Sequence, residues 1–200
     1  MAVIEPRIQY YEIACQQVLE EDYSVFSIQW MVIPEAYGVD MTPGELMRLY
    51  FAYIRFFTYP LVAPVNTGDG IEFRLLCTNI CLLKFSRPEH QDILSGKKAT
   101  LYIEGGVLVQ PGRCDQGALD FLVERIEEGI KLTLQLTDYC PLLLGSQQPS
   151  RWRKLFYRLT QAYIHKVVTV RFLSRVYRKL VGRKAQTKVV KVAIRAGAET

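Results

Sequence analysis

The stretch GALDFLVERIEEGIKLTLQLTD, residues 117–138, decides the fold. Apolar and polar residues alternate on both sides of Glu127-Glu128-Gly129, which predicts two antiparallel strands joined by a tight turn. Each strand has one apolar face and one mixed face. This pattern is typical of an antiparallel sheet that packs against the protein core on one face.

A long amphipathic helix is predicted after this hairpin, over residues 150–181, beyond a linker at 141–149. At helical spacing its apolar residues fall within one arc of about 140°. Basic side chains fall on the opposite side, and we expect five of them to form a basic surface: Arg158, Arg171, Arg175, Arg178 and Lys179. The remainder, residues 183–200, alternates weakly and is predicted to be a basic tail or an edge strand.

The elements before the hairpin are predicted from periodicity and from turn residues. Thr42-Pro43-Gly44-Glu45 has the order of a helix N-terminus, and the helix it starts is apolar around most of its circumference. The other predictions are a helix over 6–22, strands over 24–33, 71–77, 81–86, 99–104 and 107–110, and loops over 60–70 and 86–98.

Charge divides the chain unevenly. The 200 residues carry a formal net charge of +5, but residues 1–150 hold 11 basic and 19 acidic side chains, whereas residues 151–200 hold 14 basic and one acidic. The apolar content of 50% excludes intrinsic disorder for the body of the chain. The sequence therefore describes an acidic folded body with a strongly basic C-terminal segment.

The N-terminus has none of the features of a signal peptide, and the five cysteines are scattered and odd in number. These features favour free thiols and a cytoplasmic or membrane-peripheral location.

Motifs that carry chemistry are scarce. Ser95-Gly96-Lys97-Lys98 lacks the other residues of a phosphate loop, and the sequence has neither a nucleophile elbow nor a full dinucleotide fingerprint. Cys77 and Cys81 lie four residues apart without two further ligands, so no metal site is predicted. We therefore expect no cofactor and name no catalytic residue.

The order of elements resembles the helix-grip fold of the START-related superfamily, which includes polyketide cyclases, dehydrases and lipid-transport proteins. The hairpin at 117–138 and the helix from Trp152 are similar to the final hairpin and closing helix of that superfamily. The resemblance implies an α+β fold in which a curved antiparallel sheet grips the long C-terminal helix. It covers about residues 71–181, so 1–182 is predicted as one domain with an additional N-terminal helix.

The resemblance also implies an apolar cavity between the sheet and the C-terminal helix. It supports binding of a hydrophobic small molecule or lipid there, and it carries over no catalytic residue. Large apolar side chains of the strands and helices are the candidate ligand contacts: Tyr50, Tyr53, Phe57, Phe73, Leu83, Tyr102, Phe121, Leu134, Phe156 and Tyr163.

Three other functions stay open. The same cavity could serve an enzyme of cyclase or hydrolase type. The basic helix could dock on an anionic membrane or, less favoured, on nucleic acid. The acidic body and the basic segment could instead serve different partners, or pair head to tail in a dimer. For the docking functions, a packed helix with a solvated basic face is the simpler interpretation of residues 150–181.

Overall fold

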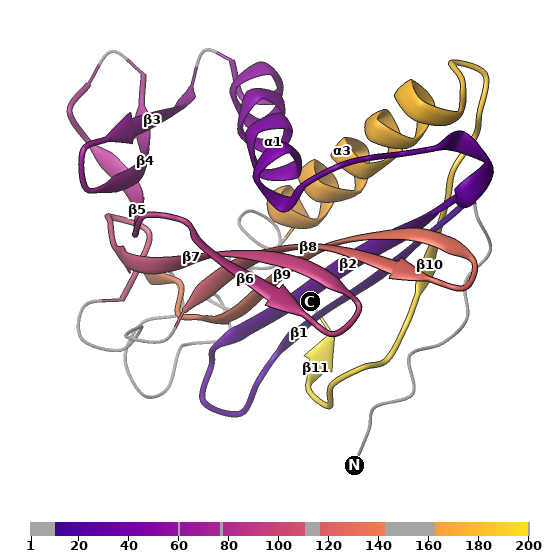
Figure 1. The fold of residues 1–200 in the computed structure, drawn as a ribbon. Helices are drawn as coiled ribbons and strands as arrows, with labels where there is room; N and C mark the ends of the chain where they lie inside the picture. Colours follow the sequence, from indigo (N-terminus) through magenta and orange to yellow (C-terminus); the bar gives the residue numbers. More distant parts are fainter. Residues whose placement is uncertain (1–10, 60, 77, 111–116, 143–162, 200) are drawn as a thin grey trace.

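The computed structural model describes residues 11–59, 61–76, 78–110, 117–142 and 163–199. Within these ranges the chain is an α+β fold with a large, curved and unclosed sheet, which is antiparallel except for one edge pair. Two α-helices, α1 (Pro43–Phe57) and α3 (Tyr163–Val181), lie on the same face of the sheet (Figure 1).

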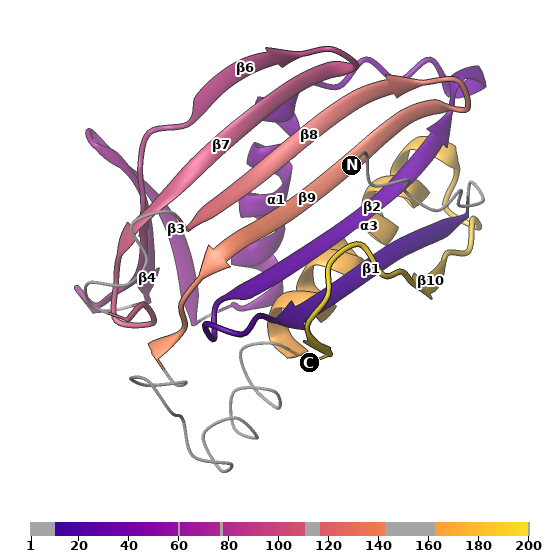
Figure 2. The ribbon, with the colours of Figure 1, turned by 90° about the horizontal axis from the view of Figure 1, so that it is seen from below.

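The strand order along the sheet is β10-β1-β2-β9-β8-β7-β5-β4-β3, with β11 pairing β1 and β6 pairing β7. Figure 2 shows the central strands side by side from the face opposite the helices. The bounds are β1 Glu12–Leu19, β2 Val25–Pro34, β3 Val62–Thr67, β4 Gly70–Leu75, β5 Cys81–Phe85, β6 Glu89–Ile93, β7 Gly96–Gly105, β8 Ala118–Ile126, β9 Gly129–Tyr139, β10 Lys188–Lys191 and β11 Ala198–Glu199, with a short 3-10 helix at Glu35–Tyr37.

The β8–β9 hairpin confirms the prediction from the alternating pattern. Phe121 pairs with Leu134 across the two strands, and both side chains are buried on the face that the helices cover. The turn needs glycine at position 129, where φ is 140° and a Cβ would collide with the carbonyl oxygen of Ile33 on β2. The tight turn therefore also lets β2 approach β9 closely.

The start of α1 is the predicted capping box. The Thr42 hydroxyl accepts a hydrogen bond from the Glu45 backbone N–H at 3.2 Å, and the Glu45 carboxylate accepts one from the Thr42 backbone N–H at 3.0 Å. The hydrogen bonds that the Glu45 carboxylate accepts from the Thr42 backbone N–H and hydroxyl lower its pKa. The two bonds from backbone N–H groups satisfy donors that a helix N-terminus otherwise leaves without partners.

Replacing Thr42 with alanine is expected to lower the free energy of unfolding by about 1 kcal/mol, because the N-cap acceptor is lost. Urea denaturation followed by circular dichroism measures the change. Gln91→Ala, at an exposed position on the edge strand β6, is the control. An unchanged midpoint for Thr42→Ala would mean that the capping box contributes nothing to stability.

The predicted N-terminal helix over residues 6–22 is wrong where the structure describes it, because β1 occupies Glu12–Leu19. Apolar residues at helical spacing mimic a helix here because both faces of this strand are buried. Ile13 belongs to the core under the helices, whereas Ala14 and Val18 belong to a smaller cluster on the opposite face. Pairing with β2 and β10 thus overrides the local pattern.

Other predicted boundaries also change. The expected loop at 60–70 contains β3, which pairs with β4, and the expected loop at 86–98 contains β6 and the start of β7, which pair with each other. The expected strand at 107–110 makes only one isolated bridge, between Val109 and Pro141. Residues 143–149 of the linker and the first part of the long helix lie outside the described residues.

The C-terminal segment pairs with β1 and covers part of the outer face of the sheet, so the edge-strand alternative for this segment is the one that the structure shows (Figure 2). Val192 and Ile194 pack on a cluster that includes Phe26 and Trp30. Gln16 holds the segment, because its amide accepts from the Ile194 N–H at 2.7 Å and donates to the Arg195 carbonyl at 2.6 Å.

Candidate functional site

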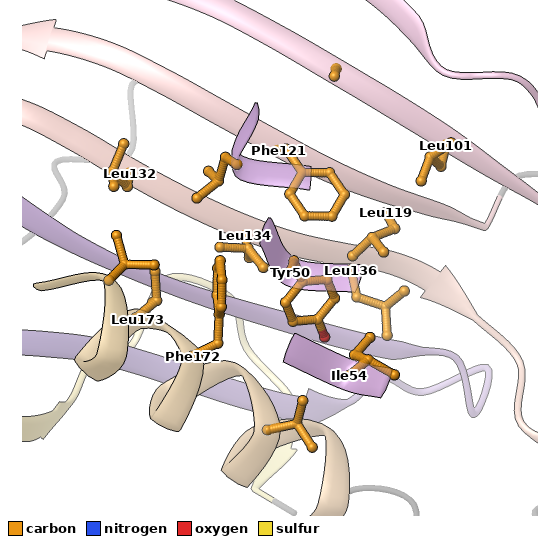
Figure 3. Packing of buried hydrophobic residues seen from close by; sticks show 14 of the residues in the cluster. Tyr50, Ile54, Leu101, Leu119, Phe121, Leu132, Leu134, Leu136, Phe172 and Leu173 are labelled. Carbon is orange, nitrogen blue, oxygen red and sulfur yellow. The ribbon is translucent and has the colours of Figure 1, made fainter. Parts of the chain in front are cut away.

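Aromatic rings pack tightly in the central part of the space between the sheet and the two helices. The Tyr50 ring of α1 lies 5.2 Å from the Phe172 ring of α3 and 5.6 Å from the Phe121 ring of β8, between ring centroids. Figure 3 shows these side chains meeting the leucines of β8 and β9. This part of the space is therefore core, as expected for close-packed interiors.

The Tyr50 hydroxyl is the polar group within this packing. It lies 3.3 Å from the Thr169 hydroxyl of α3, and burial raises the pKa of Tyr50 to about 12. The pair links α1 to α3 beneath the surface of the helix layer.

The residues predicted to contact a ligand fall into three groups. Tyr50, Phe73, Phe121 and Leu134 are buried in the core, with Tyr53, Phe57 and Leu83 partly buried against it. Tyr102 is 42% exposed and lies between two inward-facing residues, so the strand period places it on the opposite face. Phe156 lies outside the described residues, and Tyr163 is the first residue of α3. A ligand-binding role for them stays a prediction.

A groove of about 340 Å³ lies between α1 and α3, and its exposed lining residues open it to solvent. Its buried and half-buried lining is apolar or aromatic: Met41, Leu49, Tyr53, Phe172, Val176 and Leu180. Its exposed lining is Ala52, Phe56, Arg175 and Lys179. Among the described residues, the groove thus combines an apolar floor with two cations and no carboxylate.

Arg175 is held in place by the aromatic residues of α1. Its guanidinium carbon lies 4.9 Å from the centroid of the Phe56 ring and 5.8 Å from that of Tyr53. Arg171 lies similarly over Phe57, at 5.5 Å. Such cation–π contacts fix the side chains while leaving the guanidinium N–H groups free to meet an anion from solvent.

The positive charge beside the groove comes mainly from α3. Burial raises the pKa of Tyr53, and the positive charges of Arg171, Arg175 and Arg178 oppose that rise, so all three guanidiniums act on the same ring. Arg171, Arg175, Arg178 and Lys179 are exposed, and α3 carries no acidic residue; their role as a basic surface stays a prediction. Arg158 lies outside the described residues.

The groove itself was not predicted. A single arc on α3 placed Leu173, Tyr177 and Leu180 inward, but Phe172 and Val176 are also buried. The buried surface is wider because α3 packs against α1 as well as against β1 and β2. One feature of the sequence did point to the groove. Apolar residues surround most of α1, and a sheet on one side of the helix cannot cover all of them.

Two other polar features lie outside the groove. A buried group of Cys15, Ser27 and Gln29 lies on β1 and β2, where Gln29 donates to Ser27 at 2.7 Å and burial raises the pKa of the Cys15 thiol. A hollow of about 320 Å³ lies at the N-terminus of α1, lined partly by His90 and Lys97.

Within the described ranges, no three histidine, cysteine, aspartate or glutamate side chains gather as a metal ion would require. None of the helices in the described part of the chain combines the length and the apolar content needed to cross a membrane.

Comparisons with known proteins do not assign the chain to a family. No family model matches the chain, and no curated protein matches it either. Among solved structures, the crystal structure of CalU16 from Micromonospora echinospora is similar with 11% sequence identity and a TM-score of 0.34, over 86% of this chain and 97% of that chain. Identity and TM-score this low leave membership of the START-related superfamily a hypothesis.

Proposed function

We propose that the chain binds an amphipathic anion of the fatty-acid type. The apolar part of the ligand lies in the groove between α1 and α3, and its acidic head meets Arg175 and Lys179. The observation that carries the proposal is the composition of the groove, whose described lining joins an apolar floor to two cations without a carboxylate. Its volume of about 340 Å³ falls within the range of small-molecule sites.

This proposal keeps the hydrophobic ligand expected from the sequence but places it between α1 and α3. The aromatic contacts of Tyr50, Phe121 and Phe172 occupy the central space under the helices. A ligand there would have to displace close-packed rings, whereas the groove needs no rearrangement of the core.

We also infer a helix-grip arrangement related to that of the START-related superfamily. Support comes from α3 lying across the covered face of a curved sheet, and from its place after the β8–β9 hairpin in the chain. Binding rather than catalysis is proposed because the described residues of the groove lining offer no carboxylate, imidazole or thiol to exchange a proton.

Titration calorimetry with dodecanoate tests the proposal. Ala52→Trp fills the groove from an exposed position, so it should weaken binding at least tenfold without disturbing the core. Ala36→Trp, at an exposed position outside the groove, is the matched control and should bind as the unmodified protein does. Equal affinity of the two variants would refute the groove as the site.

A second comparison tests the role of charge. The double variant Arg175→Gln, Lys179→Gln should lose about tenfold or more of its affinity for dodecanoate, because charge-assisted hydrogen bonds to the carboxylate are removed. Its affinity for dodecanol, which has the same chain and no charge, should change little. Parallel losses for both ligands would show that the two cations support the groove structurally rather than bind the head group.

A further inference from the structure

Three large apolar side chains are exposed together where α1 ends and the chain turns toward β3. Phe56 is 68% exposed, Tyr59 is 75% exposed and Leu61 is 61% exposed. We call these three residues the apolar tip. Exposed apolar residues scattered singly need no explanation, but several in one short segment mark an interaction surface.

Arginines lie near the apolar tip on the side of Phe56. Arg55 lies on the last turn of α1 and is exposed, and Arg175 stacks on the Phe56 ring. Arg171 lies over Phe57, and its charge, like that of Arg178, acts on Tyr53. These four arginines come from two helices that are far apart in the sequence and lie next to each other in the fold (Figure 1).

The described parts of the two helices carry few acidic groups. The one acidic residue of α1, Glu45, lies in its first turn, at the opposite end of the helix from the apolar tip, and α3 has none. Since the net charge of residues 1–150 is negative, the positive potential is concentrated on this helix layer.

We propose that this surface docks on an anionic lipid bilayer, with the apolar tip inserted among the lipid head groups and the four arginines on the phosphates. Aromatic residues and leucine gain free energy on leaving water at the bilayer interface, and basic residues nearby are attracted by anionic lipid. The proposal goes beyond binding of a single ligand in the groove, since Tyr59 and Leu61 do not line the groove.

Lipid fits this surface better than nucleic acid does. A phosphate backbone would be met by the arginines alone, whereas Leu61 and the outer part of Phe56 would stay in water. Arg171 and Arg175 are also tied over aromatic rings, which suits a flat layer of head groups more than the base edges of a groove.

Vesicle co-sedimentation tests the proposal with the full chain. Phosphatidylcholine vesicles with about 30% phosphatidylserine, which mimic the charge of an anionic leaflet, are compared with phosphatidylcholine alone. The unmodified protein should partition onto the anionic vesicles and much less onto the neutral ones. Equal partition onto both, or none onto either, would overturn the proposal.

Two sets of variants test the residues. Arg55→Gln, Arg171→Gln and Arg178→Gln combined should weaken partition by about fivefold per removed charge. The control is Lys97→Gln with Arg125→Gln, two exposed cations elsewhere on the surface. Tyr59→Ser with Leu61→Ser should weaken partition several-fold, whereas Leu94→Ser, at a fully exposed leucine of the β6–β7 turn, should not.

A DNA duplex distinguishes lipid docking from general attraction of polyanions. Two results together would refute the proposal. The Tyr59→Ser, Leu61→Ser variant would partition onto vesicles like the unmodified protein, and the Arg55→Gln, Arg171→Gln, Arg178→Gln variant would lose vesicle binding and DNA binding alike. The surface would then be a general polyanion site. All these variants should keep their affinity for uncharged dodecanol, because none of their residues lines the groove and dodecanol does not respond to the lost charges. Failure of vesicle binding is thereby distinguishable from failure of the groove.

Discussion

Phe121→Ala is expected to lower the free energy of unfolding by about 3–5 kcal/mol. Phe121 is fully buried in β8, and its ring lies 5.6 Å from that of Tyr50 and 6.0 Å from that of Phe51. Alanine would leave a cavity at the point where the sheet meets α1. Guanidinium denaturation measured by circular dichroism gives the change.

Phe56→Ala is the matched control for this prediction. Phe56 is 68% exposed and contacts Arg175 at the surface, so its loss should cost less than about 1 kcal/mol. Equal destabilisation by the two substitutions would contradict the assignment of Phe121 to the core and of Phe56 to the surface. A small effect of Phe121→Ala alone would indicate a loosely packed space that a ligand could enter.

Stability is expected to fall between pH 10 and pH 12 through Tyr50. Burial raises the pKa of Tyr50 to about 12, against about 10 in an unfolded chain. In this window the unfolded chain has lost the Tyr50 proton while the folded chain still holds it. The free energy of unfolding therefore decreases with rising pH, by about 3 kcal/mol across the window.

Tyr50→Phe tests this pH dependence. The variant loses the hydrogen bond with Thr169 and about 1 kcal/mol at pH 8, but its stability should decline less steeply above pH 10. Denaturation at several pH values measures both quantities. Tyr59→Phe, at an exposed tyrosine, should keep the steep decline. The same slope for Tyr50→Phe and the unmodified protein would show that Tyr50 titrates normally.

Local signals in the sequence predicted the elements whose pattern has one interpretation. The alternation around Gly129 and the capping residues at Thr42 each specify a single structure, and the observed hairpin and helix agree with both. The segment of β1 has two interpretations, because a strand buried on both faces need not alternate apolar and polar residues. Only its pairing with β2 and β10 decides between them.

The candidate site was harder to predict than the fold because it depends on how two helices meet. The aromatic residues of α1 were recognised, but their division between core and groove follows from the packing of α3 against α1. Tyr50 faces the sheet, whereas Tyr53 and Phe56 face the arginines of α3. No local pattern in either helix fixes that contact.

We propose that the ligand lies between α1 and α3 and not between the helices and the sheet. Isotope-filtered NMR with methyl-labelled protein and dodecanoate tests this placement most directly. A ligand in the groove predicts contacts from its chain to the methyl groups of Leu49, Val176 and Leu180. Contacts to those of Leu101, Leu132 and Leu134 in the sheet core would contradict it.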